Sequence, residues 1–131
     1  MGSHRRLVGG LVISLLEIRK QIEGPSDDER FTAWFRLYSS DETAAREEIQ
    51  RILTGGDPVL KVLFTRFLAH INEERAVHYL VTLLQDDNEV VFHAAQKAFE
   101  HNQFGTKLKN LFGLVHSRSL LAQAYAIEKL S

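Results

Sequence analysis

The chain has 131 residues, of which 44% are hydrophobic and 25% are charged, and its formal net charge is −1. This composition is typical of a globular domain with a sizeable core and excludes a disordered chain. The near-neutral charge gives no overall argument for a nucleic acid or an anionic membrane as partner. The absence of cysteine excludes disulfides, thiol catalysis and cysteine-ligated metals. It fits a reducing compartment, so we expect a cytoplasmic protein.

Residues 5–23 are predicted to form the first helix, because apolar residues recur along them at helical spacing. The apolar run is too short to span a membrane and no small-residue cleavage site follows it, so we expect neither a membrane span nor a signal peptide. Gly24 and Pro25 end this helix. Its apolar face is wide for a terminal helix, which leaves two alternatives. The face packs internally, which we favour, or it pairs with a second subunit in a homodimer or with another partner.

Side chains that can cap a helix N-terminus recur along the rest of the chain, each followed by residues of helical periodicity. Ser26 has Glu29 three residues later, which makes a capping box, and Asp57 is followed by Pro58 at the first helical position. No segment alternates with period two for long, so no strand is predicted. The predicted caps are Ser26, Ser39, Asp57, Asn72, Asp87, Thr106 and Ser117.

A pattern of about 30 residues repeats along the chain. Four helices open at this spacing, and the same position in each carries a predicted core residue. The opening and core residues are Asp27 with Trp34, Asp57 with Phe64, Asp87 with Ala94, and Ser117 with Ala124. We therefore predict an all-α fold in a single domain, a right-handed α-solenoid of about four helical hairpins and about eight helices. The hairpins would span residues 5–38, 41–71, 73–101 and 106–131. The alternative is a closed eight-helix bundle, which does not explain the regular spacing.

The segment Asp87–Phe99, with small residues at Ala94, Ala95 and Ala98, resembles the inner helix of a HEAT-like repeat. The resemblance is closest to the short bacterial kind that is also found in phycobilin-lyase proteins. The segment beginning at Asp57 keeps the pattern, including a basic residue at Lys61. The corresponding positions of the other copies are Phe31, Val91 and Leu121. The resemblance implies an armadillo-like superhelix that commonly serves as an interaction scaffold, and it implies no reaction.

The resemblance also implies that the second helix of each hairpin lines the concave side. On these helices, positions opposite the predicted core carry arginines beside apolar side chains, which would suit an acidic, partly apolar peptide. The alternative is that Arg36 and Arg66 pair with acids of the same stripe, which contains Glu29 and Glu89. The predicted protein-binding residues are Arg36, Val59, Leu63, Arg66, His93 and Gln96.

These observations predict a non-enzymatic adaptor that offers a shallow concave groove to a protein or peptide. We predict no catalytic residue, metal site or cofactor, because nucleophile motifs and phosphate loops are absent and the histidines do not recur at one repeat position. One alternative is a HEAT-like accessory factor in enzyme or cofactor maturation, of the phycobilin-lyase kind. The other is a nucleic-acid binder using Lys107, Lys109 and Arg118, although three charges are too few for strong phosphate neutralisation.

Overall fold

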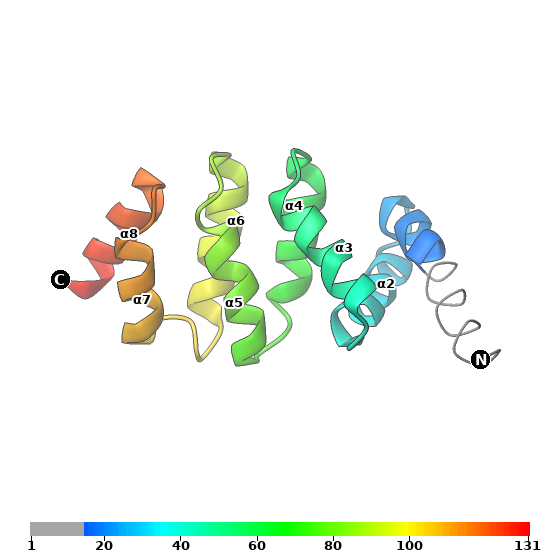
Figure 1. The fold of residues 1–131 in the computed structure, drawn as a ribbon, viewed down its shortest axis with the longest axis horizontal. Helices are drawn as coiled ribbons and strands as arrows, with labels where there is room; N and C mark the ends of the chain where they lie inside the picture. The colour runs from blue at the N-terminus through cyan, green and yellow to red at the C-terminus, as the bar shows by residue number, and fades with distance from the viewer. Residues whose placement is uncertain (1–14) are drawn as a thin grey trace. The chain divides into compact units, whose positions relative to one another are not determined.

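The computed structural model describes residues 15–131, and within that range every regular element is an α-helix (Figure 1). The all-α prediction is therefore confirmed for this part of the chain. Residues 15–23 are helical, while the earlier part of the predicted first helix lies outside the described residues. Over the described range, no helix combines the length and the apolar character that crossing a membrane requires. The labelled helices are α2 (Asp27–Ser39), α3 (Thr43–Thr54), α4 (Pro58–Leu68), α5 (Glu74–Leu83), α6 (Glu89–His101), α7 (Leu108–Val115) and α8 (Leu120–Leu130).

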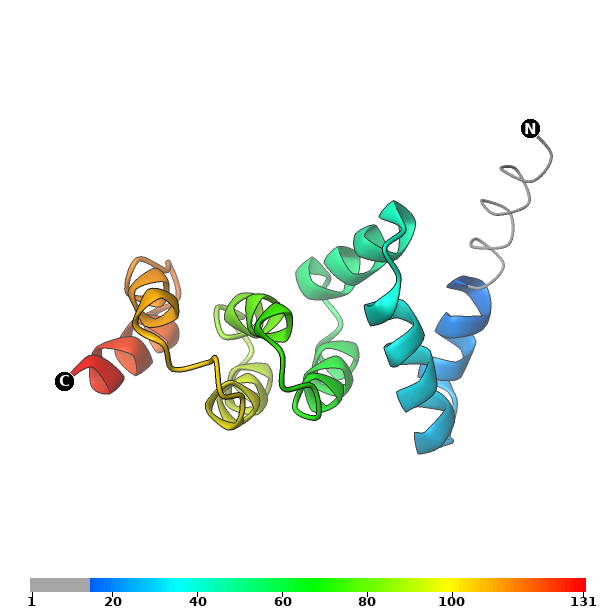
Figure 2. The same ribbon diagram turned by 90° about the horizontal axis from the view of Figure 1, so that it is seen from below.

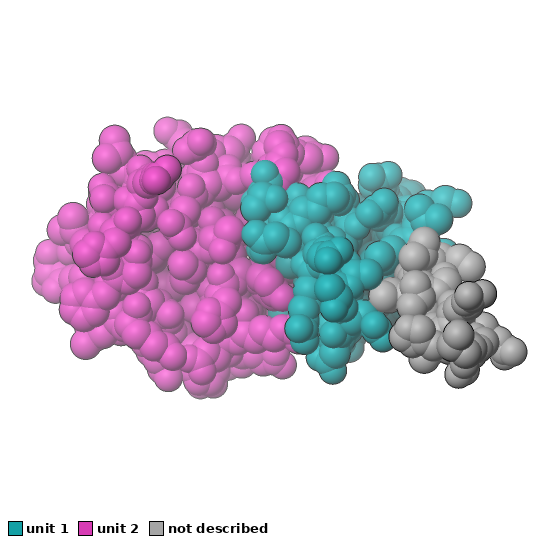
Figure 3. Space-filling view, viewed as in Figure 1, with its two compact units in different colours: residues 1–54 teal, residues 55–131 magenta. Residues whose placement is uncertain are grey.

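The chain divides into two compact units, residues 1–54 and residues 55–131 (Figure 3). The first unit contains the helical residues 15–23 together with α2 and α3. The second unit contains α4 to α8. The second unit therefore holds three of the four helices that the repeat pattern singles out.

Four N-caps recur at a constant spacing of 31 residues, at Ser26, Asp57, Asn88 and Ser119. Each side chain accepts a hydrogen bond from a backbone N–H of the first helical turn, which pairs a donor that the helix cannot pair itself. The distances run from 2.9 Å, for Asn88 Oδ1 with the Val90 N–H, to 3.3 Å, for Ser26 Oγ with the Glu29 N–H. The caps at Ser26 and Asp57 confirm the prediction.

The predicted caps at Asp87 and Ser117 are wrong, and the register of the third repeat shifts by one residue with the first of them. Capping at Asn88 turns Val91 and Ala95 into the core, where both are fully buried. Val90, which the shorter spacing places in the core, is 65% exposed. Asp87 and Asn88 are both chemically able to cap, so burial of the apolar side chains decides between them.

Three further predicted caps are also wrong. Ser39 is the last residue of α2, and the neighbouring Ser40 accepts from the Glu42 N–H at 3.2 Å instead. Asn72 Oδ1 accepts from the Gln103 N–H, so its side chain joins two loops and does not begin α5. Helix α7 begins after Lys107, without a side-chain cap, and not after Thr106.

The core of the first unit is formed by α2, which packs on α3, and by apolar side chains of residues 15–23. Trp34 and Leu37 on α2 are buried at the helical spacing i, i+3, as are Ile49 and Ile52 on α3. Ile22 is buried as well. The described end of the predicted first helix therefore contributes to an internal core, which is the alternative that we favour from the sequence.

A buried carboxylate ties the helical residues 15–23 to α3. Glu48 is only 4% exposed and accepts hydrogen bonds from Arg19 Nε at 3.0 Å and from Arg51 Nε at 2.9 Å. Burial alone would raise the pKa of Glu48, but the two arginines lower this pKa below its ordinary value. A charged Glu48 therefore stabilises the first unit.

In the second unit, α4 packs along α6, α5 contacts both of these helices, and α7 packs on α8. Figure 2 shows α5 and α7 in one layer, with α4, α6 and α8 in the other. One position stays fully buried at every 31-residue step of this layer, occupied by Phe64, Ala95 and Ala126. Ala33 holds the equivalent position of α2 in the first unit and is fully buried too.

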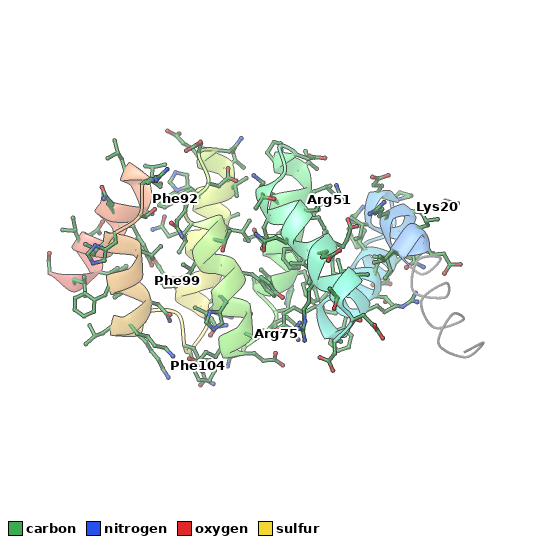
Figure 4. All side chains as sticks on the ribbon, viewed as in Figure 1. Lys20, Arg51, Arg75, Phe92, Phe99 and Phe104 are labelled. Carbon is green, nitrogen blue, oxygen red and sulfur yellow. The ribbon has the colours of Figure 1, made fainter. Side chains whose placement is uncertain are left out.

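Tyr125 joins α8 to α6. Its ring lies edge-on to Phe92 and Phe99, with centroid distances of 6.4 Å and 6.0 Å, and Figure 4 labels both phenylalanines on α6. Its hydroxyl donates to Glu100 Oε1 at 3.0 Å. Burial and this carboxylate raise the pKa of Tyr125 above its ordinary value. The tyrosine therefore stays a neutral hydrogen-bond donor.

Asn102 fixes the end of α6 to the turn between α4 and α5. Its buried side-chain amide donates to the carbonyls of Ile71 and Glu73 at 3.1 Å and 3.0 Å, and its Oδ1 accepts from the Phe104 N–H at 2.8 Å. The loop then passes so close to α6 that a Cβ on Gly105 would lie 1.9 Å from the carbonyl oxygen of Phe99. Only glycine fits at that position.

Candidate functional site

A groove of about 630 Å³ runs between α4 and α6. Its lining is mostly the small or branched apolar side chains of the two facing helices, and small residues let the surface sink between them. The lining residues are Val62, Thr65, Arg66, Ala69, Val90, His93, Ala94, Lys97, Ala98 and His101.

A second hollow of about 340 Å³ shares Val62, Arg66 and Val90 with the groove and extends it toward the N-terminal ends of both helices. It adds Val59 and Leu63 from α4. Because N-terminal residues of α4 meet N-terminal residues of α6 here, and Ala69 meets His101 at the other end, the two helices run in the same direction. We call the two hollows together the α4–α6 groove.

The α4–α6 groove is basic at one end and apolar at the other. Arg66, Lys97 and His101 lie toward the C-terminal ends of the helices, and His93 lies one turn before Lys97. No carboxylate lines either hollow. Val59 lies at the opposite, apolar end.

The two strongest cations of the groove have no acidic partner. Neither Arg66 nor Lys97 makes an ion pair with any residue that the structure describes. Other cations of the second unit do pair, since Lys61 contacts Asp86 and Lys109 contacts Glu74. The alternative that Arg66 pairs with Glu89 therefore finds no contact to support it.

The structure brings together four of the six predicted binding residues, since Val59, Leu63, Arg66 and His93 all line the α4–α6 groove. The other two lie apart from it. Gln96 is half-buried outside the lining, and its Nε2 donates to Glu100 Oε1 at 3.5 Å. Arg36 belongs to the other unit, where it is exposed near the end of α2.

Val90, Ala94 and Lys97 line the groove although the sequence pattern placed them in core positions. The error has the same origin as the misplaced cap, because a one-residue shift of α6 exchanges neighbouring positions between the core and the surface. A sequence signal could have found them. The spacing of 31 residues from Asp57 to Asn88 makes Lys97 the counterpart of Arg66.

A smaller hollow of about 260 Å³ lies beside the α4–α5 turn, where His70 and His101 approach Asn72 and Asn102. Both asparagines already use side-chain atoms in hydrogen bonds to the backbone. Among the described residues, no group of three or more His, Cys, Asp or Glu side chains is placed to hold a metal ion.

The basic end patch suggested by Lys107, Lys109 and Arg118 is largely engaged within the chain. Lys109 forms an ion pair with Glu74 on α5, and Lys107 lies over the ring of Phe104 at 4.7 Å. Arg118 is exposed in the turn before α8. Phosphate contacts by the two lysines would have to replace these internal contacts.

An exposed apolar face lies on the last hairpin of the second unit. Leu108 and Phe112 on α7, together with Leu120 and Ile127 on α8, are each more than half exposed. Their spacings of four and seven residues put each pair on one side of its helix. This face carries no charged residue at these positions, so it differs in chemistry from the α4–α6 groove.

No protein-family model matches the chain, and the comparisons with curated proteins and with solved structures found no match. The functional reading therefore depends on the geometry of the chain itself.

Proposed function

We propose that the four hairpins belong to one right-handed HEAT-like α-solenoid. The constant spacing of the caps at Ser26, Asp57, Asn88 and Ser119 supports this proposal, because a closed bundle does not require equal spacing. The same spacing gives two copies, and not one, the basic residue of the HEAT-like pattern. Arg30 is the counterpart of Lys61, and each follows its helix cap by four residues.

We propose that the protein is a non-enzymatic interaction scaffold that binds a protein or peptide partner in the α4–α6 groove. The observation that carries the proposal is the groove itself, an apolar channel with cations that have no acidic partner within the described chain. Such a surface gains by covering its apolar area and by pairing Arg66 and Lys97 with carboxylates. No specific observation favours the accessory factor or the nucleic-acid binder in the same way.

Site-specific photo-cross-linking tests this function. A benzoylphenylalanine replaces Val90, which lines the groove and is largely exposed, and a matched control carries it at Thr82, which is exposed on α5. The full chain is irradiated in a lysate of cells that produce it. We expect one or a few proteins to cross-link at position 90 and not at position 82.

A charge reversal makes the result specific. The Arg66→Glu/Lys97→Glu double variant should abolish the cross-link at position 90. A control double variant, Lys20→Glu/Arg118→Glu, changes the net charge equally at two exposed sites outside the groove and should leave the cross-link intact. Equal labelling at positions 82 and 90, or equal loss in both double variants, would rule out the groove as the binding surface.

A further inference from the structure

We propose, building on the function above, that the occupant of the α4–α6 groove is an acidic amphipathic α-helix of a partner protein. The partner helix would lay apolar side chains on Val62 and Ala94 and place carboxylates over Arg66 and Lys97. This mode of recognition is helix-in-groove binding.

The charge of the occupant follows from the cations that line the groove. His93, Lys97 and His101 recur at i, i+4 and i+8 on one face of α6, and Arg66 faces them from α4. Cations in the last turn of a helix also offset its C-terminal partial charge, which would account for Arg66 and His101 alone. Lys97 precedes the last turn of α6, so a ligand with carboxylates explains it better.

The helical conformation of the occupant follows from the lack of hydrogen-bonding groups on the floor. The backbone groups of α4 and α6 are paired within their helices, so the groove offers no strand edge to an extended peptide. The one hydroxyl of the floor, on Thr65, already donates to the Lys61 carbonyl at 2.7 Å. An extended peptide would leave its own buried N–H groups unpaired, whereas a helix pairs them internally.

The length of the groove and the uneven distribution of its charges define the partner further. Helix α4 has 11 residues. At 1.5 Å per residue the groove is therefore about 16 Å long, which accommodates about three turns of a partner helix. Because the cations cluster at one end and Val59 and Leu63 lie at the other, the carboxylates of the partner should cluster at one end of its helix.

Selection from a phage-displayed library of random 16-residue peptides, with the full chain as bait, tests the proposal. We expect the enriched peptides to carry two or more Asp or Glu residues one turn apart, beyond an apolar segment, and to be helical when bound. Arg66→Glu/Lys97→Glu should weaken the tightest peptide by at least about tenfold, because two charge-assisted contacts become repulsive. The Lys20→Glu/Arg118→Glu control should bind it unchanged.

Two peptide variants separate charge from conformation. Replacing the acidic residues of the peptide with Lys should restore binding to the Arg66→Glu/Lys97→Glu variant, and a central proline should abolish binding to the original chain. Enrichment of basic or uncharged peptides, tolerance of the proline, or the absence of any binder would overturn the proposal. If position 90 nevertheless cross-links specifically to a protein, the scaffold function stands and only the acidic-helix occupant fails.

Discussion

Lys61 and Asp86 form an ion pair whose side chains are only 10% and 11% exposed, and it joins α4 to the turn before α6. Removing one partner of a buried pair leaves the other charge without compensation. We expect Lys61→Met, which keeps the aliphatic stem, to lower the free energy of unfolding by about 2–4 kcal/mol in urea titrations.

The exposed pair Lys109–Glu74 provides the control for that measurement, and Lys109→Met should have little effect. Adding Asp86→Leu to Lys61→Met should recover part of the loss, because no unpaired charge then remains buried. If Lys61→Met and Lys109→Met cost the same, the buried pair has no structural role of this kind.

Glu48 should make the stability of the first unit depend on pH. Its pKa is lowered in the folded state, so the unfolded state binds the proton more tightly than the folded state does. The stabilisation is fully present above the ordinary pKa of about 4.5 and is lost as the pH falls through the lower folded-state value. We expect thermal melts to show a smaller loss of stability between about pH 6 and 3 in Glu48→Gln than in the original chain.

Glu48→Gln should also be less stable than the original chain at neutral pH, because Arg19 and Arg51 lose their carboxylate partner. Glu47→Gln removes the same charge from the exposed neighbouring position and should keep the original pH dependence. Parallel pH profiles for Glu47→Gln and Glu48→Gln would contradict this role of Glu48.

At the scale of the element, the register of α6 depends on which of two adjacent residues caps it. Asn88→Ala removes a side-chain acceptor for the N–H groups of Val90 and Val91 and should cost about 1 kcal/mol in urea unfolding. Asp87 is exposed and does not cap the helix, so Asp87→Ala should cost much less. A larger loss for Asp87→Ala would restore the shorter repeat spacing.

The helices themselves were largely predictable from the sequence, because strong caps and helical periodicity act locally. Ser26 and Asp57 each stand directly before an apolar run with no competing cap beside them. Before α6, Asp86, Asp87 and Asn88 are three successive residues that can all cap. Only the packing of Val91 and Ala95 against neighbouring helices selects among them, and a local pattern does not contain that information.

The candidate site was predictable to the extent that its residues follow the correct register. Val59, Leu63 and Arg66 were found because the cap at Asp57 was placed correctly. Lys97 was missed because the shifted cap assigned its position to the core. The absence of an ion pair at Arg66 and Lys97 depends on which acidic residues come close in space, so only the structure could reveal it.

At the scale of the whole molecule, two exposed surfaces compete as binding sites. The α4–α6 groove combines an apolar floor with cations, whereas the face formed by Leu108, Phe112, Leu120 and Ile127 offers apolar side chains alone. Apolar area favours association with many partners, while charge complementarity selects among them. We therefore assign partner recognition to the groove.

An NMR titration of the full chain with the tightest selected peptide tests this assignment most directly, since the selection favours no surface in advance. The assignment predicts that amide shifts concentrate on α4 and α6, at Val62, Arg66, Ala94 and Lys97, and that the Arg66→Glu/Lys97→Glu variant loses them. Shifts confined to α7 and α8, with the amides of α4 and α6 unchanged, would contradict it.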